Sequence, residues 1–205
     1  MENTKLQLQK AIETARAGGI IIFPTDTAFG IGCRIDNHAA VDRLFNIRRR
    51  PIAQAMPVLV SNIEMALTYY LDVPDIVRHL MKEYWPGALT IVAPCKKNLI
   101  YSPIRGGGNT VGLRMPNHPA ILKIIEEVGI PILGPSANFH GALTPYSMAD
   151  LNPELVKLVD FVVPASTRRH RRGGPGECTV KQASTVVDCS VTPYKIIRKG
   201  AVKLE

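Results

Sequence analysis

Apolar residues recur along the chain at two different spacings, and the spacing separates the expected helices from the expected strands. From Leu6 to Ala15 they recur every three or four residues until Gly18, which predicts a helix over 5–17. The unbroken apolar run 20–23 is too short for a helix and predicts a buried strand. The same reasoning predicts further helices over 38–47, 61–70, 74–84, 117–128 and 146–158. It predicts further strands over 29–33, 56–60, 89–93, 110–114, 131–134, 161–163, 184–188 and 194–198.

Helix-capping residues refine two of these boundaries. Ser61 with Glu64 fits a capping box. Asn117 and Pro119 fit the start of a helix that Gly129 closes. Helices and strands are interleaved, but the last two strands lie close enough in sequence to pair with each other. We therefore expect an α/β protein of α+β-like character, with one twisted, mixed, open sheet and flanking helices. No repeat or linker divides the sequence, so we expect a single domain over residues 1–205.

The charge of the chain indicates an anionic partner. Its 25 basic and 17 acidic residues leave a net charge of +8, which suits nucleic acid or a phosphorylated small molecule. Much of the excess lies in two arginine clusters, 48–50 and 168–172, both in expected loops. This placement favours local anion sites over a broad basic face.

Other features of the composition exclude several classes of protein. The polar N-terminal segment does not resemble a signal peptide, and no apolar run approaches the roughly 20 residues of a membrane span. We expect a soluble, cytoplasmic protein that does not bind a membrane. The four cysteines and five histidines are scattered, which predicts free thiols and no protein-bound metal.

The stretch GGIIIFPTDTAFGIG, residues 18–32, places hydroxyls, a carboxylate and glycines directly after a buried strand. Polar groups at that position are typical of a ligand site in an open α/β sheet, and a tight strand-turn-strand connection is the alternative. In IRRRPIAQAMP, residues 47–57, an arginine fork suits phosphate or carboxylate oxygens. A solvated helix end is the alternative there.

Two further stretches carry candidate binding groups. In NTVGLRMP, residues 109–116, alternation places Thr110 and Arg114 on one face. There Arg114 can bind a carboxylate or phosphate. The alternative is that the strand lies at the edge of the sheet and Arg114 reaches solvent. In LGPSANFHG, Ser136 and Asn138 follow a buried strand and can hold a phosphate or an amino-acid carboxylate, or form an ordinary turn. The sequence contains no P-loop, no GxGxxG after a strand and no evident nucleophile-base pair. The implied chemistry is positioning and charge neutralisation, as in phosphoryl or nucleotidyl transfer.

Seven stretches in order resemble motifs of the threonylcarbamoyl-AMP synthase family, also called YrdC-like. They are PTDTAFGIG, RRRPIAQAMPVLV, WPGALT, TVGLRMP, GPSAN, STVVD and IIRKG, and the resemblance covers about residues 10–200. It implies a twisted mixed sheet around a large concave basic cavity, without the additional C-terminal domain of longer relatives. It also implies synthesis of threonylcarbamoyl-AMP and pyrophosphate from L-threonine, bicarbonate and ATP, with Mg²⁺ accompanying the ATP. The product would pass to a tRNA threonylcarbamoyl transferase complex for the N6-threonylcarbamoyladenosine modification at tRNA position 37.

The resemblance also implies roles for individual residues. The expected contacts to L-threonine are Thr27, Arg114, Ser136 and Ser184. The expected contacts to ATP are Arg50, Gln54, Thr110, Asn138, Tyr146 and Arg198. The residues expected to act in catalysis are Arg48, Arg50 and Arg114, and we expect Arg114→Ala to abolish turnover without unfolding the protein. The chain departs from the family pattern at Phe29, Arg48, Gln54, Leu59 and His140.

Two other functions remain open from the sequence. The charge and the arginine clusters also suit a YrdC-like module that binds tRNA or double-stranded RNA without synthesis, although aromatic residues make up only 6% of the chain. The other open function is that of an ATP-dependent paralogue that acts on another amine substrate. The basic loop 165–182 is expected to be a lid over the triphosphate, an RNA or partner contact, or a solvated loop.

Overall fold

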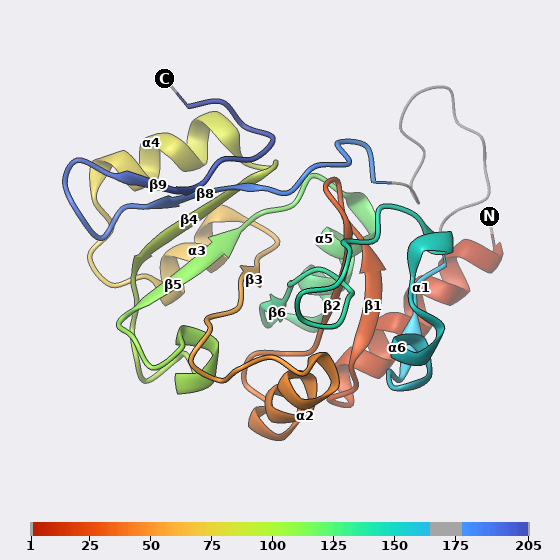
Figure 1. Cartoon of the computed structure of the whole chain (residues 1–205). Helices are drawn as coiled ribbons and strands as arrows, with labels where there is room; N and C mark the ends of the chain where they lie inside the picture. The colour runs from red at the N-terminus through yellow and green to blue at the C-terminus, as the bar shows by residue number, and fades with distance from the viewer. Residues whose placement is uncertain (1, 165–177, 205) are drawn as a thin grey trace.

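The helices and strands follow one another along the chain in the expected order. A computed structural model describes residues 2–164 and 178–204 (Figure 1). The helices are α1 (Glu2–Arg16), α2 (His38–Arg48), α3 (Ile63–Tyr69), α4 (Asp75–Tyr84), α5 (Pro119–Val128) and α6 (Pro153–Lys157), with 3₁₀ turns η1 (Ser102–Arg105) and η2 (Met148–Asp150). The strands are β1 (Ile21–Pro24), β2 (Phe29–Gly32), β3 (Val58–Leu59), β4 (Leu89–Pro94), β5 (Thr110–Arg114), β6 (Ile132–Leu133), β7 (Phe161–Val162), β8 (Thr185–Asp188) and β9 (Lys195–Arg198).

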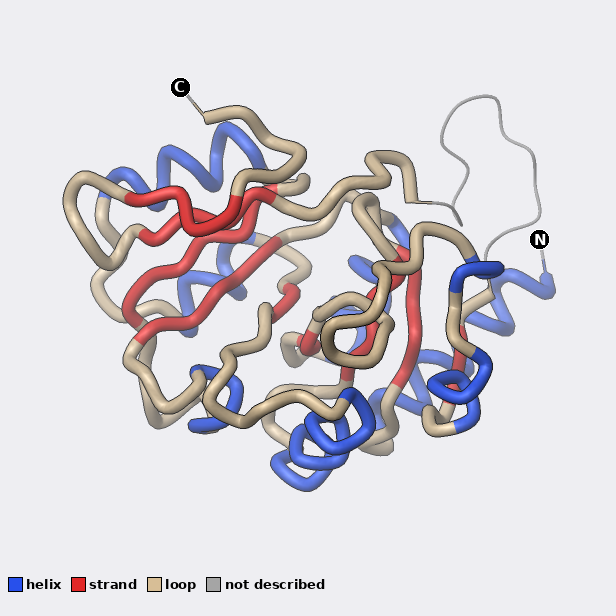
Figure 2. Tube along the Cα trace, in the orientation of Figure 1, coloured by secondary structure: helices blue, strands red, loops and turns tan. Residues whose placement is uncertain are grey.

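The described strands form two mixed sheets instead of one. A small sheet has the order β2-β1-β7, and a larger sheet has the order β6-β3-β5-β4-β8-β9. The strands are the red segments in Figure 2. Strands β8 and β9 pair antiparallel, as their closeness in sequence predicts. Strand β5 lies inside the larger sheet, parallel to β3 and antiparallel to β4, so the edge-strand alternative for Arg114 is wrong.

The two sheets meet where β2 approaches β6. Isolated bridges pair Gly30 with Ser136 and Arg34 with Ile132. The approach depends on Gly32, because a Cβ at this position would stand 1.7 Å from the carbonyl oxygen of Leu133. A glycine is therefore required at Gly32 for the sheets to join.

Capping residues differ from the sequence prediction at two helix starts. The Asn62 side chain caps α3 by accepting from the Met65 N–H at 2.7 Å, so the predicted Ser61 capping box is wrong. His118, and not Asn117, caps α5 by accepting from the Ala120 N–H at 3.3 Å. Gly129 ends α5 with a φ of 74°, as predicted.

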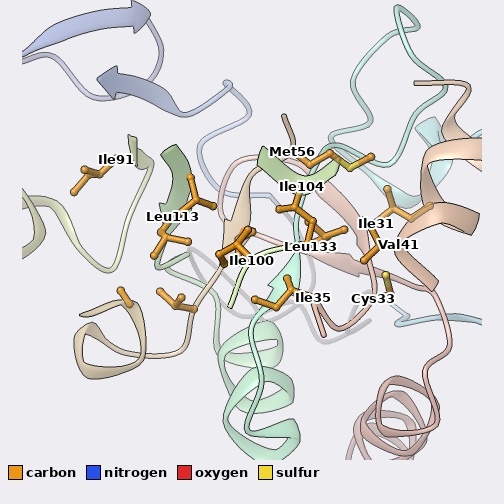
Figure 3. Packing of buried hydrophobic residues seen from close by; sticks show 14 of the residues in the cluster. Ile31, Cys33, Ile35, Val41, Met56, Ile91, Ile100, Ile104, Leu113 and Leu133 are labelled. Carbon is orange, nitrogen blue, oxygen red and sulfur yellow. The ribbon is translucent and has the colours of Figure 1, made fainter. Parts of the chain in front are cut away.

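Two hydrophobic clusters hold the sheets and helices together. The larger cluster includes Val41 of α2, Leu113 of β5 and Leu133 of β6 (Figure 3). In the smaller cluster, α5, which contributes Ile124, packs against α1, which contributes Ala11. No helix in the described part of the chain is long and apolar enough to cross a membrane.

The four cysteines are buried free thiols, which predicts slow labelling of the native protein. Burial raises the pKa of Cys33 to about 12 and the pKa values of Cys178 and Cys189 to about 11. Because the thiolate is the reactive form, we expect a thiol reagent at pH 8 to label these side chains slowly until urea unfolds the chain. Fast labelling of all four in the native state would contradict this.

The same thiols predict a loss of stability at alkaline pH. In the unfolded chain these thiols ionise near their ordinary pKa, whereas in the folded chain they hold their protons to a higher pH. The folded state therefore binds more protons over this interval, and the free energy of unfolding should fall as the pH rises from about 9 to 12. Urea denaturation at pH 8.5 and pH 11 measures the effect, and equal midpoints would refute it.

Candidate active site

A cavity of about 180 Å³ lies beside the junction of the two sheets. One water needs roughly 10–15 Å³ by such a measure, so the cavity has room for a ligand. Its walls come from the β1–β2 turn, the end of α2, the end of β5, the loop after β6, the segment just before β8 and the end of β9. The described lining residues are Thr25, Thr27, Ala28, Phe29, Gly30, Arg48, Arg50, Pro57, Arg114, Gly134, Pro135, Ser136, Thr144, Ala183, Ser184 and Arg198. The structure thus brings together seven of the predicted site residues: Thr27, Arg48, Arg50, Arg114, Ser136, Ser184 and Arg198.

Arg114 is fixed at the cavity by three hydrogen bonds. Its Nε donates to the Gly87 carbonyl at 2.9 Å, Nη1 to Thr27 Oγ1 at 2.7 Å and Nη2 to an Asp26 carboxylate oxygen at 2.5 Å. Both ionised side chains are buried, Arg114 at 6% exposure and Asp26 at 3%. Burial lowers the pKa of Arg114, and the Asp26 charge opposes that shift. A guanidinium has five N–H donors, so two remain for a ligand.

Asp26 was not among the residues that sequence reasoning assigned to the site. The acid stands within PTDTAFGIG, but nothing in the sequence pairs it with an arginine 88 residues away. The Asn117 backbone N–H also donates to the same carboxylate oxygen, at 3.2 Å. Asp26 therefore holds Arg114 and the start of the α5 segment together.

The β1–β2 turn is organised by the Thr25 hydroxyl. It donates to the Ala28 carbonyl at 2.6 Å and accepts from the Thr27 and Ala28 backbone N–H groups, both at 3.2 Å. Side-chain hydroxyls that bond to neighbouring backbone groups stabilise such turns. The turn presents Thr27 to the cavity at a fixed position beside Arg114.

Arg48 contributes a second buried guanidinium, with 3% of its surface exposed. Its Nε donates to the Asn138 carbonyl and its Nη2 to the Asn138 side-chain oxygen, each at 3.1 Å. Its Nη1 is buried and has no partner among the described residues. Burial, with the nearby Arg50 charge, lowers the pKa of Arg48 to about 10. An unpaired buried cation of this kind favours an anionic ligand.

Two further arginines complete the basic lining. Arg50 donates to the carbonyls of Gln54 at 3.1 Å and Ala55 at 2.7 Å, which fixes the loop after α2. Arg198 of β9 donates to the carbonyl and the hydroxyl of Ser184, both at 3.0 Å. The Ser184 hydroxyl also shares a 2.9 Å hydrogen bond with Thr90, another residue that sequence reasoning missed.

The balance of charge around the cavity is strongly positive. Four arginines line it, and no acidic residue is among the described residues that do so. Asp26 is not among the described lining residues, and its carboxylate forms an ion pair with Arg114. The described part of the chain contains no cluster of acidic, histidine and cysteine side chains arranged to hold a metal ion. The cavity is therefore suited to a ligand with more than one anionic group.

Four of the predicted ATP contacts do not line the described cavity. Gln54 is exposed and meets Arg50 through its backbone carbonyl. Thr110 lies at the opposite end of β5 from Arg114. Asn138 lies behind Arg48 and Ser136, and the backbone N–H of Tyr146 donates to Asp150 at 3.0 Å. Their roles remain predictions.

The departures from the family pattern also have defined places. Phe29 lines the cavity, whereas Leu59 is buried in the core beside Gly134. The backbone N–H of His140 donates to the Arg48 carbonyl at 2.8 Å. Residues 165–177 of the predicted basic loop lie outside the described residues; beyond them, the Val180 N–H donates to the Asp26 carbonyl at 2.8 Å.

Comparison with known proteins gives matches over most of the chain. The family described as Sua5_yciO_yrdC, Telomere recombination, matches residues 13–200. A protein of Bacillus subtilis named threonylcarbamoyl-AMP synthase is 32% identical over 203 residues, 97% of this chain and 55% of that protein.

Two solved structures show the same fold. The crystal structure of Pyrococcus abyssi Sua5 complexed with L-threonine has a TM-score of 0.83 and 29% identity, covering 94% of this chain and 54% of that one. The crystal structure of Escherichia coli YciO has a TM-score of 0.75 and 26% identity, covering 96% of this chain and 90% of that one.

The chain spans about half the length of the Bacillus and Pyrococcus relatives and nearly all of YciO. The matching family extends across nearly the whole sequence and includes every element that lines the cavity. The chain therefore belongs to the Sua5/YciO/YrdC family.

Proposed function

We propose that the chain is an L-threonylcarbamoyladenylate synthase, an enzyme that makes threonylcarbamoyl-AMP and pyrophosphate from L-threonine, bicarbonate and ATP. One observation carries the proposal: four guanidiniums and the hydroxyls of Thr27, Ser136 and Ser184 line one cavity, and none of its described lining residues is acidic. Such a lining suits the simultaneous binding of a polyphosphate, a carboxylate and a hydroxylated amino acid. The relatives named threonylcarbamoyl-AMP synthase and the Sua5 structure with L-threonine support the same assignment.

The geometry supports a division of the cavity into two parts. Arg114, which Asp26 and Gly87 hold in place, would bind the carboxylate of threonine beside Thr27. Arg48 and Arg50, at the end of α2, would bind phosphate oxygens of ATP. The free Nη1 of Arg48 supports this role because a buried donor without a partner gains a hydrogen bond when an anion enters.

The chemistry proceeds in two balanced steps. The amine nitrogen of threonine forms a bond to the carbon of bicarbonate, and water leaves to give a carbamate. A carbamate oxygen then attacks the α-phosphorus of ATP, and the bond to pyrophosphate breaks. The chain holds the reactants together and neutralises charge on the triphosphate. Mg²⁺ would accompany the ATP, coordinated by its phosphates.

Pyrophosphate release by the purified chain tests the proposal. With ATP, Mg²⁺, bicarbonate and L-threonine we expect release that depends on both threonine and bicarbonate, and threonylcarbamoyl-AMP in the product mixture. Release that is equal without threonine would contradict the assignment. L-serine and other amino acids are the comparison substrates, and a preference for one of them would favour a paralogue with another amine substrate.

RNA binding is the less favoured second function. Two arginines of the clusters that suggested it, Arg48 and Arg50, line the cavity, and neither is exposed. Retention of tRNA at 150 mM salt without any pyrophosphate release would support a binding module instead. Transfer of the product to a tRNA threonylcarbamoyl transferase complex is part of the same proposal.

A further inference from the structure

The direction of the hydrogen bonds around Ser136 can be assigned from its neighbours. The Asn138 side chain contacts both Arg48 Nη2, at 3.1 Å, and Ser136 Oγ, at 2.7 Å, through one atom. A guanidinium only donates, so that atom must be the amide oxygen. The Ser136 hydroxyl must then donate its single proton to Asn138. Toward the cavity, Ser136 presents lone pairs only.

Thr27 is less restricted than Ser136. The Thr25 hydroxyl donates its proton to the Ala28 carbonyl at 2.6 Å, and its two lone pairs already accept from the Thr27 and Ala28 N–H groups, so the 3.1 Å contact between the two threonine hydroxyls does not fix the proton of Thr27. Arg114 Nη1 donates to Thr27 Oγ1 at 2.7 Å. One lone pair and the proton of Thr27 therefore remain for a ligand.

The cavity therefore separates donors from acceptors. Its guanidiniums only donate and suit the anionic parts of a ligand, while Ser136 only accepts and suits an N–H or O–H group. Thr27 adjoins Arg114, the proposed carboxylate site, whereas Asn138 links Ser136 to Arg48, the proposed phosphate site. The ligand group that must reach the phosphate side is the amine, because the carbamate forms on it.

We propose that Ser136 accepts a hydrogen bond from the amine of the amino-acid substrate, and that Asn138 is the positioning residue that holds Ser136 in this role. The inference rests on the proposed function and names the group that recognises the amine. An uncharged acceptor suits this position, because four nearby guanidiniums disfavour an ammonium ion and favour the neutral amine. The neutral amine has the lone pair that carbamate formation requires.

Calorimetric titration of the full chain with two ligands tests this assignment. L-Threonine and (R)-3-hydroxybutyrate share the carboxylate and the hydroxyl, and only threonine has the amine. We expect the wild type to bind threonine at least about tenfold more tightly, and Ser136→Ala to weaken threonine by about 10–100-fold while leaving 3-hydroxybutyrate unchanged. Equal affinities in the wild type, or equal losses for the two ligands in Ser136→Ala, would overturn the assignment.

Two variants at one position test the role of Asn138. Asn138→Asp keeps an acceptor for the Ser136 proton but loses the N–H group that donates to the Ala142 carbonyl at 2.5 Å, so we expect weaker binding of both ligands with the preference for threonine retained. Asn138→Leu removes the acceptor, and we expect the threonine preference to fall to about that of Ser136→Ala. A purely structural role would weaken both ligands equally in both variants and would refute the positioning role.

The same titrations separate this inference from the proposed function. Selective loss of threonine in Ser136→Ala together with no pyrophosphate release by the wild type would leave the inference standing and refute the synthase. Equal losses of affinity for the two ligands in Ser136→Ala, together with threonine-dependent pyrophosphate release by the wild type, would refute the inference and leave the synthase assignment standing. Failure of the wild type to bind threonine at all would overturn both.

Discussion

Replacing Arg114 by alanine should reduce kcat/KM for pyrophosphate release by roughly 100-fold or more, because the proposed carboxylate site loses a fixed, buried guanidinium. The sequence led us to expect that this variant stays folded. The structure changes that expectation, because Asp26, at 3% exposure, would keep its charge without its ion-pair partner. Breaking a buried pair on one side costs about 3–5 kcal/mol, so we also expect a lower urea midpoint.

A second variant separates the two effects. Arg114→Ala combined with Asp26→Asn removes the unpaired charge, and an asparagine oxygen can still accept from the Asn117 N–H. The double variant should recover much of the stability and none of the activity. If activity returned with stability, the catalytic assignment of Arg114 would be wrong.

Arg43→Ala is the matched control. Arg43 also pairs with an aspartate, Asp160 at 2.6 Å, but its side chain is 46% exposed, and Arg43 is not among the described residues that line the cavity. Exposed ion pairs contribute about 0–1 kcal/mol, so this variant should keep both activity and most of its stability. A loss of activity and stability comparable to that of Arg114→Ala would show that the effect of Arg114→Ala arises from damage to the fold and not from a change in the cavity.

Gly32→Ala should destabilise the protein by about 2–4 kcal/mol, since the new Cβ would overlap the Leu133 carbonyl at the junction of the sheets. The clash is with backbone, so no side-chain rotation relieves it. Separating β2 from β6 would also strain the 3.0 Å hydrogen bond from the Leu133 N–H to the Cys33 carbonyl. Urea denaturation followed by circular dichroism measures the loss.

The control for this variant is Gly108→Ala. A Cβ at Gly108 would have its nearest neighbour, the Arg105 carbonyl oxygen, at 3.4 Å, and the backbone φ lies outside the left-handed region. Its cost should be about 0.5 kcal/mol or less. Similar costs at Gly32 and Gly108 would show that the sheets do not depend on the close approach.

Local patterns in the sequence predicted the elements well, because helical and strand periodicity act over a few residues. The strand 110–114 coincides with β5, and α5 ends at Gly129 as expected. The choice of cap was less predictable, since Ser61 and Asn62 are both good capping residues and only the chain geometry selects Asn62. The division into two sheets was also missed, because pairing between distant strands leaves no local signal.

The candidate site shows the same limit. Hydroxyls and arginines after buried strands indicated that Thr27, Arg114 and Ser136 could meet, and they do line one cavity. The partners behind the wall, Asp26 and Asn138, were not predicted in their supporting roles. Their contacts join residues that lie 88 and 90 positions apart, and no spacing rule connects such pairs.

The described lining of the cavity begins at Thr25 and ends at Arg198. The arginine that lies farthest along the chain, Arg198, belongs to β9, so the basic wall of the cavity is complete only once the last strand has paired with β8. A folding chain therefore needs its C-terminal hairpin in place before all four guanidiniums line one cavity.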